Sequence, residues 1–147
     1  MGEPMRALSV RQPWAWAICH GKNVENRTHG TRYRGLLAIH ASKSAPYRED
    51  LDDPRIIDAI AANGLDDASA AQGAVVAVAE LAGCHGPDDC LGTCSLWAAR
   101  GHYHWNLWDV RPLADPVPCK GMLGLWRLPD DVEKLVRAQL GEGAEHD

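Results

Sequence analysis

The sequence predicts an α+β fold, a small mixed β-barrel flanked by helices. Candidate strands outnumber candidate helices and do not alternate regularly with them, which argues against a doubly wound sheet. The 147 residues suit a single core, and no internal repeat or long linker divides them. We therefore expect one domain over residues 1–147, in which residues 129–147 form a C-terminal helix and a frayed tail.

The first two elements are predicted from local residue patterns and from the positions of a proline and a glycine. RALSV, residues 6–10, has the pattern of a short strand. PWAWAICHG, residues 13–21, is typical of a short helix. Pro13 suits its first position and Gly21 suits the position just past its end.

Two further strands are predicted around a charged segment. The alternation in NVENR sets Glu25 and Arg27 on one face of the first strand. The run LLAIHAS at residues 36–42 is rich in strand-forming residues, and it sets His40 and Ser42 on one face.

The rest of the chain contains two more helices and three more strands by the same reasoning. Periodicity predicts an amphipathic helix with Ile56, Ile57 and Ile60 on one stripe, a buried strand, an alternating strand, a last strand and a terminal helix. In that order, the segments are PRIIDAIAAN (54–63), GAVVAVAEL (73–81), HYHWNLWDVRPL (102–113), MLGLWRL (122–128) and PDDVEKLVRAQL (129–140). Residues 65–72 and 114–121 are expected to be loops.

Charge is distributed unevenly along the chain. The net charge of −5 argues against broad nonspecific DNA binding. Residues 1–48 nevertheless hold eight Lys or Arg against two Glu, a charge of +6, so the remainder carries −11. A locally basic face suits a small anionic ligand or a short stretch of nucleic acid. The alternative is a set of scattered solvating charges.

The sequence also bears on location. No apolar run approaches the roughly 20 residues of a membrane helix. The first residues, MGEPMRALSVRQP, lack the apolar core of a secretory signal. We therefore expect a cytoplasmic protein with no membrane partner.

The segment HGKNVENR clusters both signs of charge just after the first helix. Either it is a solvated turn with a surface ion pair, or it is a site. A partly desolvated Lys22 can act as a base or activate a nucleophile, and Glu25 can orient it or shuttle protons. Arg27 offers a planar fork for a phosphate or a developing oxyanion. Together they can activate water to hydrolyse an amide without a metal, or only bind a phosphate.

Four quoted segments carry a resemblance to a known family. They are LSVRQPWAWAI, GKNVENR, YRGLLAIHASK and HWNLWDVRPLADPVPCKGMLGLW. Together they resemble the ASCH domain, a branch of the PUA-like superfamily, over roughly residues 6–128. The family's Gly–(x)–Lys–x–x–Glu–x–Arg pattern is matched here by Gly21, Lys22, Glu25 and Arg27. The resemblance implies a PUA-like barrel with a cleft between the first helix and the barrel.

The resemblance implies several functions for that cleft. Relatives bind RNA or a modified nucleoside, remove the acyl group from acetylcytidine, or cleave RNA. In the acetylcytidine amidohydrolases a threonine stands where this chain has Glu25, and a separate glutamate completes the triad. Glu80 is the candidate for that second acid, and the alternative is an exposed residue at the strand's end.

The remaining ligand-binding candidates lie near the ends of predicted elements around this cleft. They are Arg11, Gln12, Trp14, His40, Ser42, Lys43 and Lys120. Arg11 and Gln12 can face an anion at the strand-to-helix junction, or simply cap the helix. A tryptophan at a cleft rim can stack on a base, or can pack in the core. A lone histidine such as His40 can also be purely structural.

The segment GCHGPDDCLGTC holds a second candidate site. Cys84, His85, Cys90 and Cys94 offer four zinc ligands, and His102 and His104 follow downstream. The spacing is not a C-x-x-C pair, and reduced, partly buried thiols in a turn are the alternative. A metal here would be a structural zinc, and no other cofactor is expected.

Two function classes remain open. The first is a module that binds RNA or a modified nucleoside, with single-stranded or duplex nucleic acid as partner. The second is a metal-independent hydrolase that uses Lys22 and Glu25. The missing threonine favours the first. A protein-interaction adaptor that uses the acidic residues 49–67 is a third possibility, with no partner indicated.

Overall fold

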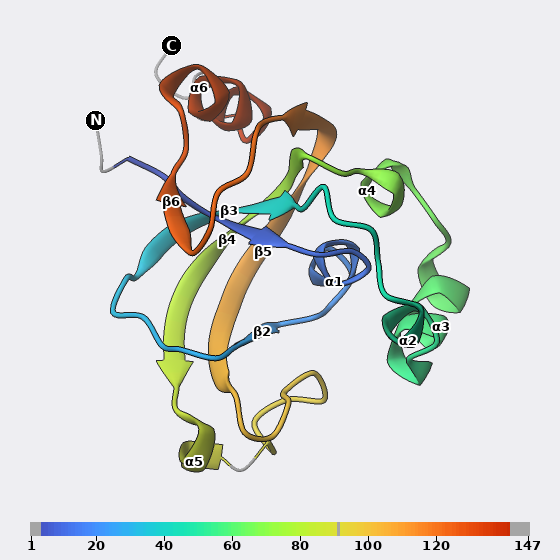
Figure 1. Ribbon diagram of the computed structural model, residues 1–147. Coiled ribbons are helices and arrows are strands. Elements are labelled where there is room, and N and C mark those ends of the chain that lie inside the picture. The colour runs from blue at the N-terminus through green and yellow to red at the C-terminus, as the bar shows by residue number, and fades with distance from the viewer. Residues whose placement is uncertain (1–3, 91, 142–147) are drawn as a thin grey trace.

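The computed structural model describes residues 4–90 and 92–141, and in that part of the chain six strands form one mixed sheet (Figure 1). The strands are β1 (Arg6–Val10), β2 (Val24–Arg27), β3 (Gly35–Ala41), β4 (Ala74–His85), β5 (Tyr103–Pro118) and β6 (Leu125–Arg127). Their order is β2-β5-β4-β3-β1-β6. Only β1 and β3 pair in parallel among these strands. The sheet curls into a half-barrel, which confirms the predicted mixed sheet flanked by helices.

Helices cover both faces of the sheet. They are α1 (Trp14–Ile18), α2 (Arg48–Leu51), α3 (Pro54–Asn63), α4 (Asp67–Ala70), α5 (Pro87–Cys90) and α6 (Asp130–Gln139). Ile18 of α1 packs on one face against Trp105 of β5. Val136 of α6 packs on the other face against Val78 of β4. Full burial of each such side chain stabilises the fold by about 1.5 to 3 kcal/mol, so both helices hold the sheet in place.

Helix α3 begins and ends where the sequence predicts. The Asp53 side chain accepts a hydrogen bond from the Arg55 amide, and Gly64 ends the helix with φ +75°. The predicted apolar stripe is partly wrong. Ile56 is fully buried, but Ile57 is 52% exposed because the buried stripe continues through Ala59 instead.

The second half of the sheet corrects two predicted boundaries. Residues 114–118, predicted as a loop, continue β5 because Val117 pairs with Val75 of β4 and is buried under α6. The last strand is shorter than predicted, since Met122 and Leu123 are exposed and β6 begins at Leu125. The pairing of β4 with β5 shifts register along its length, which fits two long, strongly bent strands.

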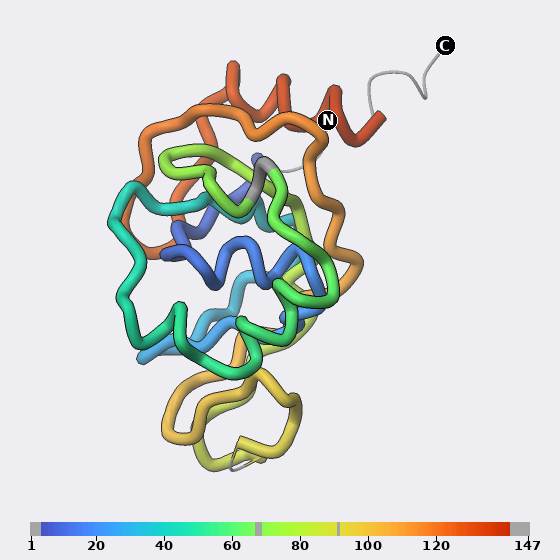
Figure 2. The backbone as a smooth tube through the Cα atoms, turned by 90° about the vertical axis from the view of Figure 1, so that its right-hand side faces the viewer, coloured from blue at the N-terminus to red at the C-terminus, as the bar shows by residue number. Residues whose placement is uncertain are grey.

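A separate lobe extends from one end of the sheet. Figure 2 shows that the chain between β4 and β5 projects away from the main body. The predicted frayed end at residues 142–147 lies outside the described residues. None of the helices in the described part of the chain has both the length and the apolar character needed to cross a membrane.

Candidate functional site

A pocket of about 260 Å³ lies between the ends of β1 and β3 and the segment that leads into β6. The parallel register sets Ser9 of β1 beside His40 of β3 at this pocket. Its lining residues are Ser9, His40, Ser42, Lys43, Gly121, Met122 and Leu123. The structure thus brings together three residues that the sequence indicated, His40, Ser42 and Lys43.

His40 is held on both of its ring nitrogens. Its Nε2 lies 2.7 Å from the carbonyl oxygen of Cys119, and its Nδ1 lies 3.0 Å from Ser9 Oγ. A carbonyl only accepts, so we assign the ring proton to Nε2. Nδ1 of the neutral ring then accepts from the Ser9 hydroxyl. The edge-to-face contact with Trp126, at 5.4 Å between ring centroids, fixes the ring plane.

Burial governs the charge of His40. The residue is 1% exposed. Desolvation lowers the pKa of His40 below its ordinary value, and the hydrogen bond to Cys119 opposes this only in part. The imidazole is therefore neutral at pH 7, and it can accept a proton at Nδ1.

Gly121 closes the pocket by approaching His40 closely. A β-carbon at this position would lie 2.6 Å from His40 Cε1 and 2.8 Å from Ser9 Oγ, so only glycine fits. The neighbouring Lys120, predicted to bind ligand, is exposed but is not part of the pocket lining.

Lys22 and Glu25 form a buried ion pair. Gly21, with φ +107°, turns the chain after α1 so that Lys22 points inward. Lys22 Nζ donates to Glu25 Oε1 at 2.7 Å and to the carbonyl oxygen of Val24 at 2.6 Å. The two residues are only 2% and 8% exposed, so both charges are satisfied inside the protein.

Arg27 links this ion pair to the pocket. Its Nε lies 3.2 Å from Glu25 Oε2, and its Nη2 donates to the carbonyl oxygen of Ser9 at 2.8 Å. Ser9 in turn holds His40. The charged motif therefore fixes the backbone of a strand that lines the pocket, while Lys22 itself lies inside the protein.

The junction residues before α1 have structural partners. Gln12 is buried, and its side chain accepts from the Trp16 amide and donates to the Ala71 carbonyl. Arg11 donates to the Ala45 carbonyl at 2.6 Å and stacks on Tyr47. The Gln12 contact with Trp16 matches helix capping, the alternative that the sequence left open, whereas Arg11 holds the loop at Ala45 and Tyr47.

Trp14 lies beside the motif, away from the pocket. Its ring makes an edge-to-face contact with Trp97, with 6.5 Å between ring centroids. Lys22 Nζ and Arg55 lie 5.7 Å and 5.8 Å from its centre. The ring thus helps to cover the buried lysine.

Glu80 lies on the opposite face of the sheet from the ion pair. It is exposed, next to the exposed Trp108 with which it pairs across strands. Its neighbour Leu81 packs in the core with Trp105, the cross-strand partner of Glu25. Because successive side chains alternate between faces, Glu80 does not reach Lys22 and Glu25.

A second group of polar side chains lies in the lobe between β4 and β5. The ligand atoms of His85, Cys90 and Cys94 lie within 4.8 Å of one another. Cys84, predicted as a fourth ligand, points to the other face and packs against the core. His104 lies beside the two thiols, with its Nδ1 3.2 Å from Cys90 Sγ and 3.5 Å from Cys94 Sγ.

The two thiols of this group titrate differently. Desolvation opposes ionisation of Cys90, but hydrogen bonds from Cys94 and from the Gly92 backbone outweigh it and lower the pKa of Cys90 to about 7. Burial and the neighbouring Cys90 raise the pKa of Cys94 to about 11. The pair therefore favours one shared proton.

Sequence reasoning missed three residues of the pocket. Ser9 was treated only as part of a strand, and Met122 and Leu123 as part of another. The one available signal was the similar pattern of the two strands, since pairing LSV with IHA sets Ser9 opposite His40. Nothing local indicated that Met122 and Leu123 precede the strand.

Comparison with known proteins agrees with this architecture. No curated protein matches the sequence. A crystal structure of an ASCH protein from Zymomonas mobilis has a TM-score of 0.58 at 12% identity, covering 92% of this chain and 94% of that one. A crystal structure of a mutant of that protein has the same score and identity, covering 92% and 98%. Both share the fold of this chain. The sequence profile of the ASCH domain matches residues 8–117, and the chain therefore belongs to the ASCH domain family.

Proposed function

We propose that this protein binds RNA, or a single modified nucleoside, in the pocket lined by Ser9, His40, Ser42 and Lys43. The ASCH domain is a PUA-like fold associated with RNA binding. The observation that carries the proposal is the convergence of these polar side chains on one small pocket at the ends of two inner strands of the curled sheet.

The size and chemistry of the pocket suit one nucleoside. Its volume of about 260 Å³ is just below the roughly 300–1,000 Å³ of ordinary small-molecule sites. Met122 and Leu123 give an apolar wall for a base, and the two serine hydroxyls give hydrogen-bonding partners for its edge or for a ribose. A duplex does not fit such a space, so we infer a single-stranded segment or a free nucleoside.

Charge supports an anionic ligand at the pocket mouth. Lys43 is exposed there, and it belongs to the basic first third of the chain. An ammonium group at the mouth can pair with a phosphate that follows the bound base. The buried Lys22–Glu25 pair serves as a support that positions Arg27 and the Ser9 backbone.

A hydrolase is the second candidate. The favouring observation is the 3.0 Å contact between Ser9 Oγ and His40 Nδ1, with the other ring nitrogen held by a carbonyl. Here Ser9 would be the nucleophile, His40 the base, and the carbonyl the group that orients the base. This arrangement activates a hydroxyl or a water molecule. The burial of Lys22 moves this alternative from Lys22 and Glu25 to Ser9 and His40.

Fluorescence anisotropy with a labelled, mixed-sequence single-stranded RNA tests binding. Lys43→Ala is expected to weaken binding about tenfold, since it removes one charged hydrogen bond. Lys134→Ala is the matched control, because it removes the same charge from the exposed surface of α6 and is expected to bind normally. Equal weakening in both variants would indicate diffuse electrostatics and overturn the pocket.

Chromatography of the same RNA and of acetylcytidine after incubation separates the two candidates. Binding without product supports the binding module. Product that is formed by the wild type and lost in Ser9→Ala would establish the hydrolase.

A further inference from the structure

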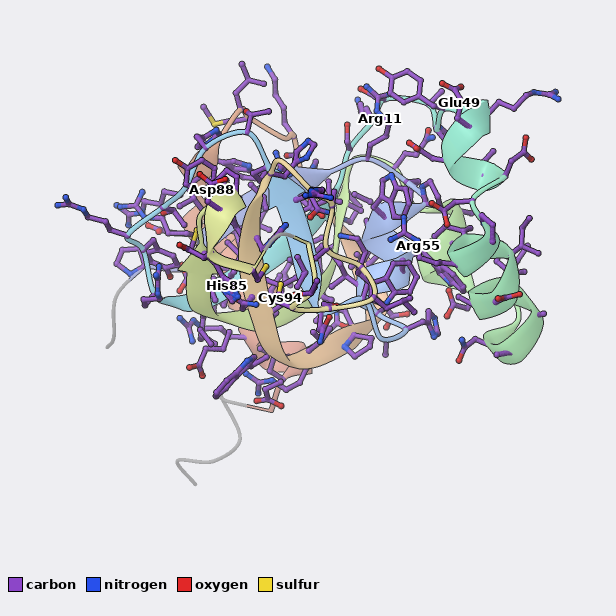
Figure 3. The ribbon with its side chains drawn as sticks, turned by 90° about the horizontal axis from the view of Figure 1, so that it is seen from below. Arg11, Glu49, Arg55, His85, Asp88 and Cys94 are labelled. Carbon is purple, nitrogen blue, oxygen red and sulfur yellow. The ribbon has the colours of Figure 1, made fainter. Side chains whose placement is uncertain are left out.

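Four side chains converge in the lobe between β4 and β5, away from the pocket. His85 ends β4, Cys90 ends α5, Cys94 follows in the loop and His104 lies near the start of β5. The antiparallel register of β4 and β5 sets His85 directly opposite His104. Figure 3 shows His85 and Cys94 next to one another in the view from below.

His104 presents a lone pair to both thiols. It is fully buried, and its Nε2 lies 2.6 Å from the carbonyl oxygen of Ala99. That carbonyl can only accept, so Nε2 carries the ring proton. Nδ1 is then unprotonated and faces Cys90 Sγ and Cys94 Sγ. Metal-bound histidines commonly have their second nitrogen fixed in this way.

The distances from His104 to the two sulfurs match those of a tetrahedral metal site. With a Zn–S distance of about 2.3 Å and a Zn–N distance of about 2.0 Å, a sulfur and a nitrogen on one zinc lie about 3.5 Å apart. The two distances from His104 Nδ1 to sulfur are 3.2 Å and 3.5 Å. A ring nitrogen of His85 lies within 4.8 Å of both sulfurs, so a fourth candidate ligand is next to the same two thiols.

We propose that His85, Cys90, Cys94 and His104 bind one zinc ion. Two thiolates and two imidazoles in a tetrahedral arrangement select Zn²⁺ among the common divalent metals. All four positions are taken by protein ligands, so the metal is structural and has no open position for a substrate. Cys84 and His102 are not ligands, because Cys84 packs in the core and the His102 ring contacts the Arg100 carbonyl.

The proposed zinc fastens the lobe beside the charged motif. Between the ligands Cys94 and His104, the carbonyl of Trp97 accepts from the Asn26 side chain and the amide of Ala99 donates to it. Asn26 lies in β2, and Trp97 packs on Trp14. Loss of the metal is therefore expected to loosen the cover over Lys22, whereas the Ser9–His40 pocket lies elsewhere in the sheet.

Metal content of the untagged, reduced protein tests the site directly. We expect one zinc per chain, and we expect Cys94→Ser and His104→Asn each to lower the content at least tenfold. Cys84→Ser is the matched control, because it removes a nearby thiol without removing a ligand, and it should keep the full content. Retention of zinc in Cys94→Ser and His104→Asn, or its loss in Cys84→Ser, would overturn the assignment.

A second measurement covers the case in which a variant fails to fold. The wild-type protein is stripped of metal with a chelator and titrated with Co²⁺ while its absorption spectrum is recorded. Saturation at one equivalent, with thiolate charge-transfer bands and the visible bands of tetrahedral cobalt, supports two cysteine ligands. A titration with no such bands would contradict the site.

Discussion

At the residue scale, burial of the Lys22–Glu25 pair has a large desolvation cost, and the ion pair and its hydrogen bonds offset that cost. Each charge has a partner within 2.7 Å and almost no solvent. Removing one partner leaves the other charge buried, so Lys22→Met is expected to destabilise the protein by about 3 to 5 kcal/mol in urea unfolding.

The double variant checks this reason. In Lys22→Met/Glu25→Leu no charge is left buried from the pair, so we expect less destabilisation than the sum of the two single variants. A cost below about 1 kcal/mol for Lys22→Met would instead indicate a solvated surface pair.

Gly121 is a second residue on which the pocket depends. The β-carbon of Gly121→Ala would overlap His40, whose ring is held by two hydrogen bonds and cannot move easily. We expect a loss of about 1 to 3 kcal/mol in stability, together with loss of nucleoside binding. In Gly83→Ala the new carbon lies at an ordinary 3.4 Å from Asn106, so this control should keep both properties.

His40 links stability to pH. The pKa of His40 is lower in the folded state than in the unfolded state. As the pH falls, the histidine of the unfolded chain is therefore protonated before that of the folded protein. Its stabilising contribution is fully present above about pH 6.5, and it is lost as the pH falls from there toward the folded pKa. His40→Gln keeps a donor for the Cys119 carbonyl but does not titrate, so the stability of this variant should fall less over that range. An identical pH profile for both proteins would contradict a neutral, buried His40.

At the scale of elements, α6 shows how far periodicity predicts packing. The pattern DDVEKLVRAQ predicted a terminal helix, and Val132 and Val136 pack on the sheet as a 3.6-residue repeat requires. Val136→Ala is expected to lower the free energy of unfolding by about 2 kcal/mol. Leu135→Ala, at a position 58% exposed, should change it by less than about 0.5 kcal/mol. Equal effects in urea unfolding would show that the buried face is assigned wrongly.

The ends of β5 and β6 mark the limit of such prediction. Pro116 and Pro118 indicated a loop, but the strand continues because Val117 is buried between β4 and α6. Tertiary packing overrides local propensity there.

The pocket was predictable only in part for a similar reason. His40, Ser42 and Lys43 follow from one strand, whereas Ser9 joins them through parallel pairing that only the folded sheet reveals.

For the whole molecule, the fold separates two chemical regions. The pocket lies where β1 and β3 meet the segment before β6. The cysteine–histidine lobe projects from the end of β4 and β5 (Figures 1 and 2). The resemblance implied a cleft beside the first helix, whereas the pocket lies at the ends of β1 and β3 and shares with the predicted ligand-binding residues only His40, Ser42 and Lys43. In the second, three of the four residues indicated by the sequence lie together, His85, Cys90 and Cys94. Cys84 lies on the other face, which depends on strand register.

This separation makes ligand binding directly observable in one experiment. Amide chemical shifts of the ¹⁵N-labelled protein would be followed while a short single-stranded RNA is added. The proposed pocket predicts saturable shifts at Ser9, Lys43 and Gly121, with little change in α6 or in the lobe around Cys94. Shifts confined to other surfaces, or no shifts at millimolar RNA, would contradict binding in the pocket.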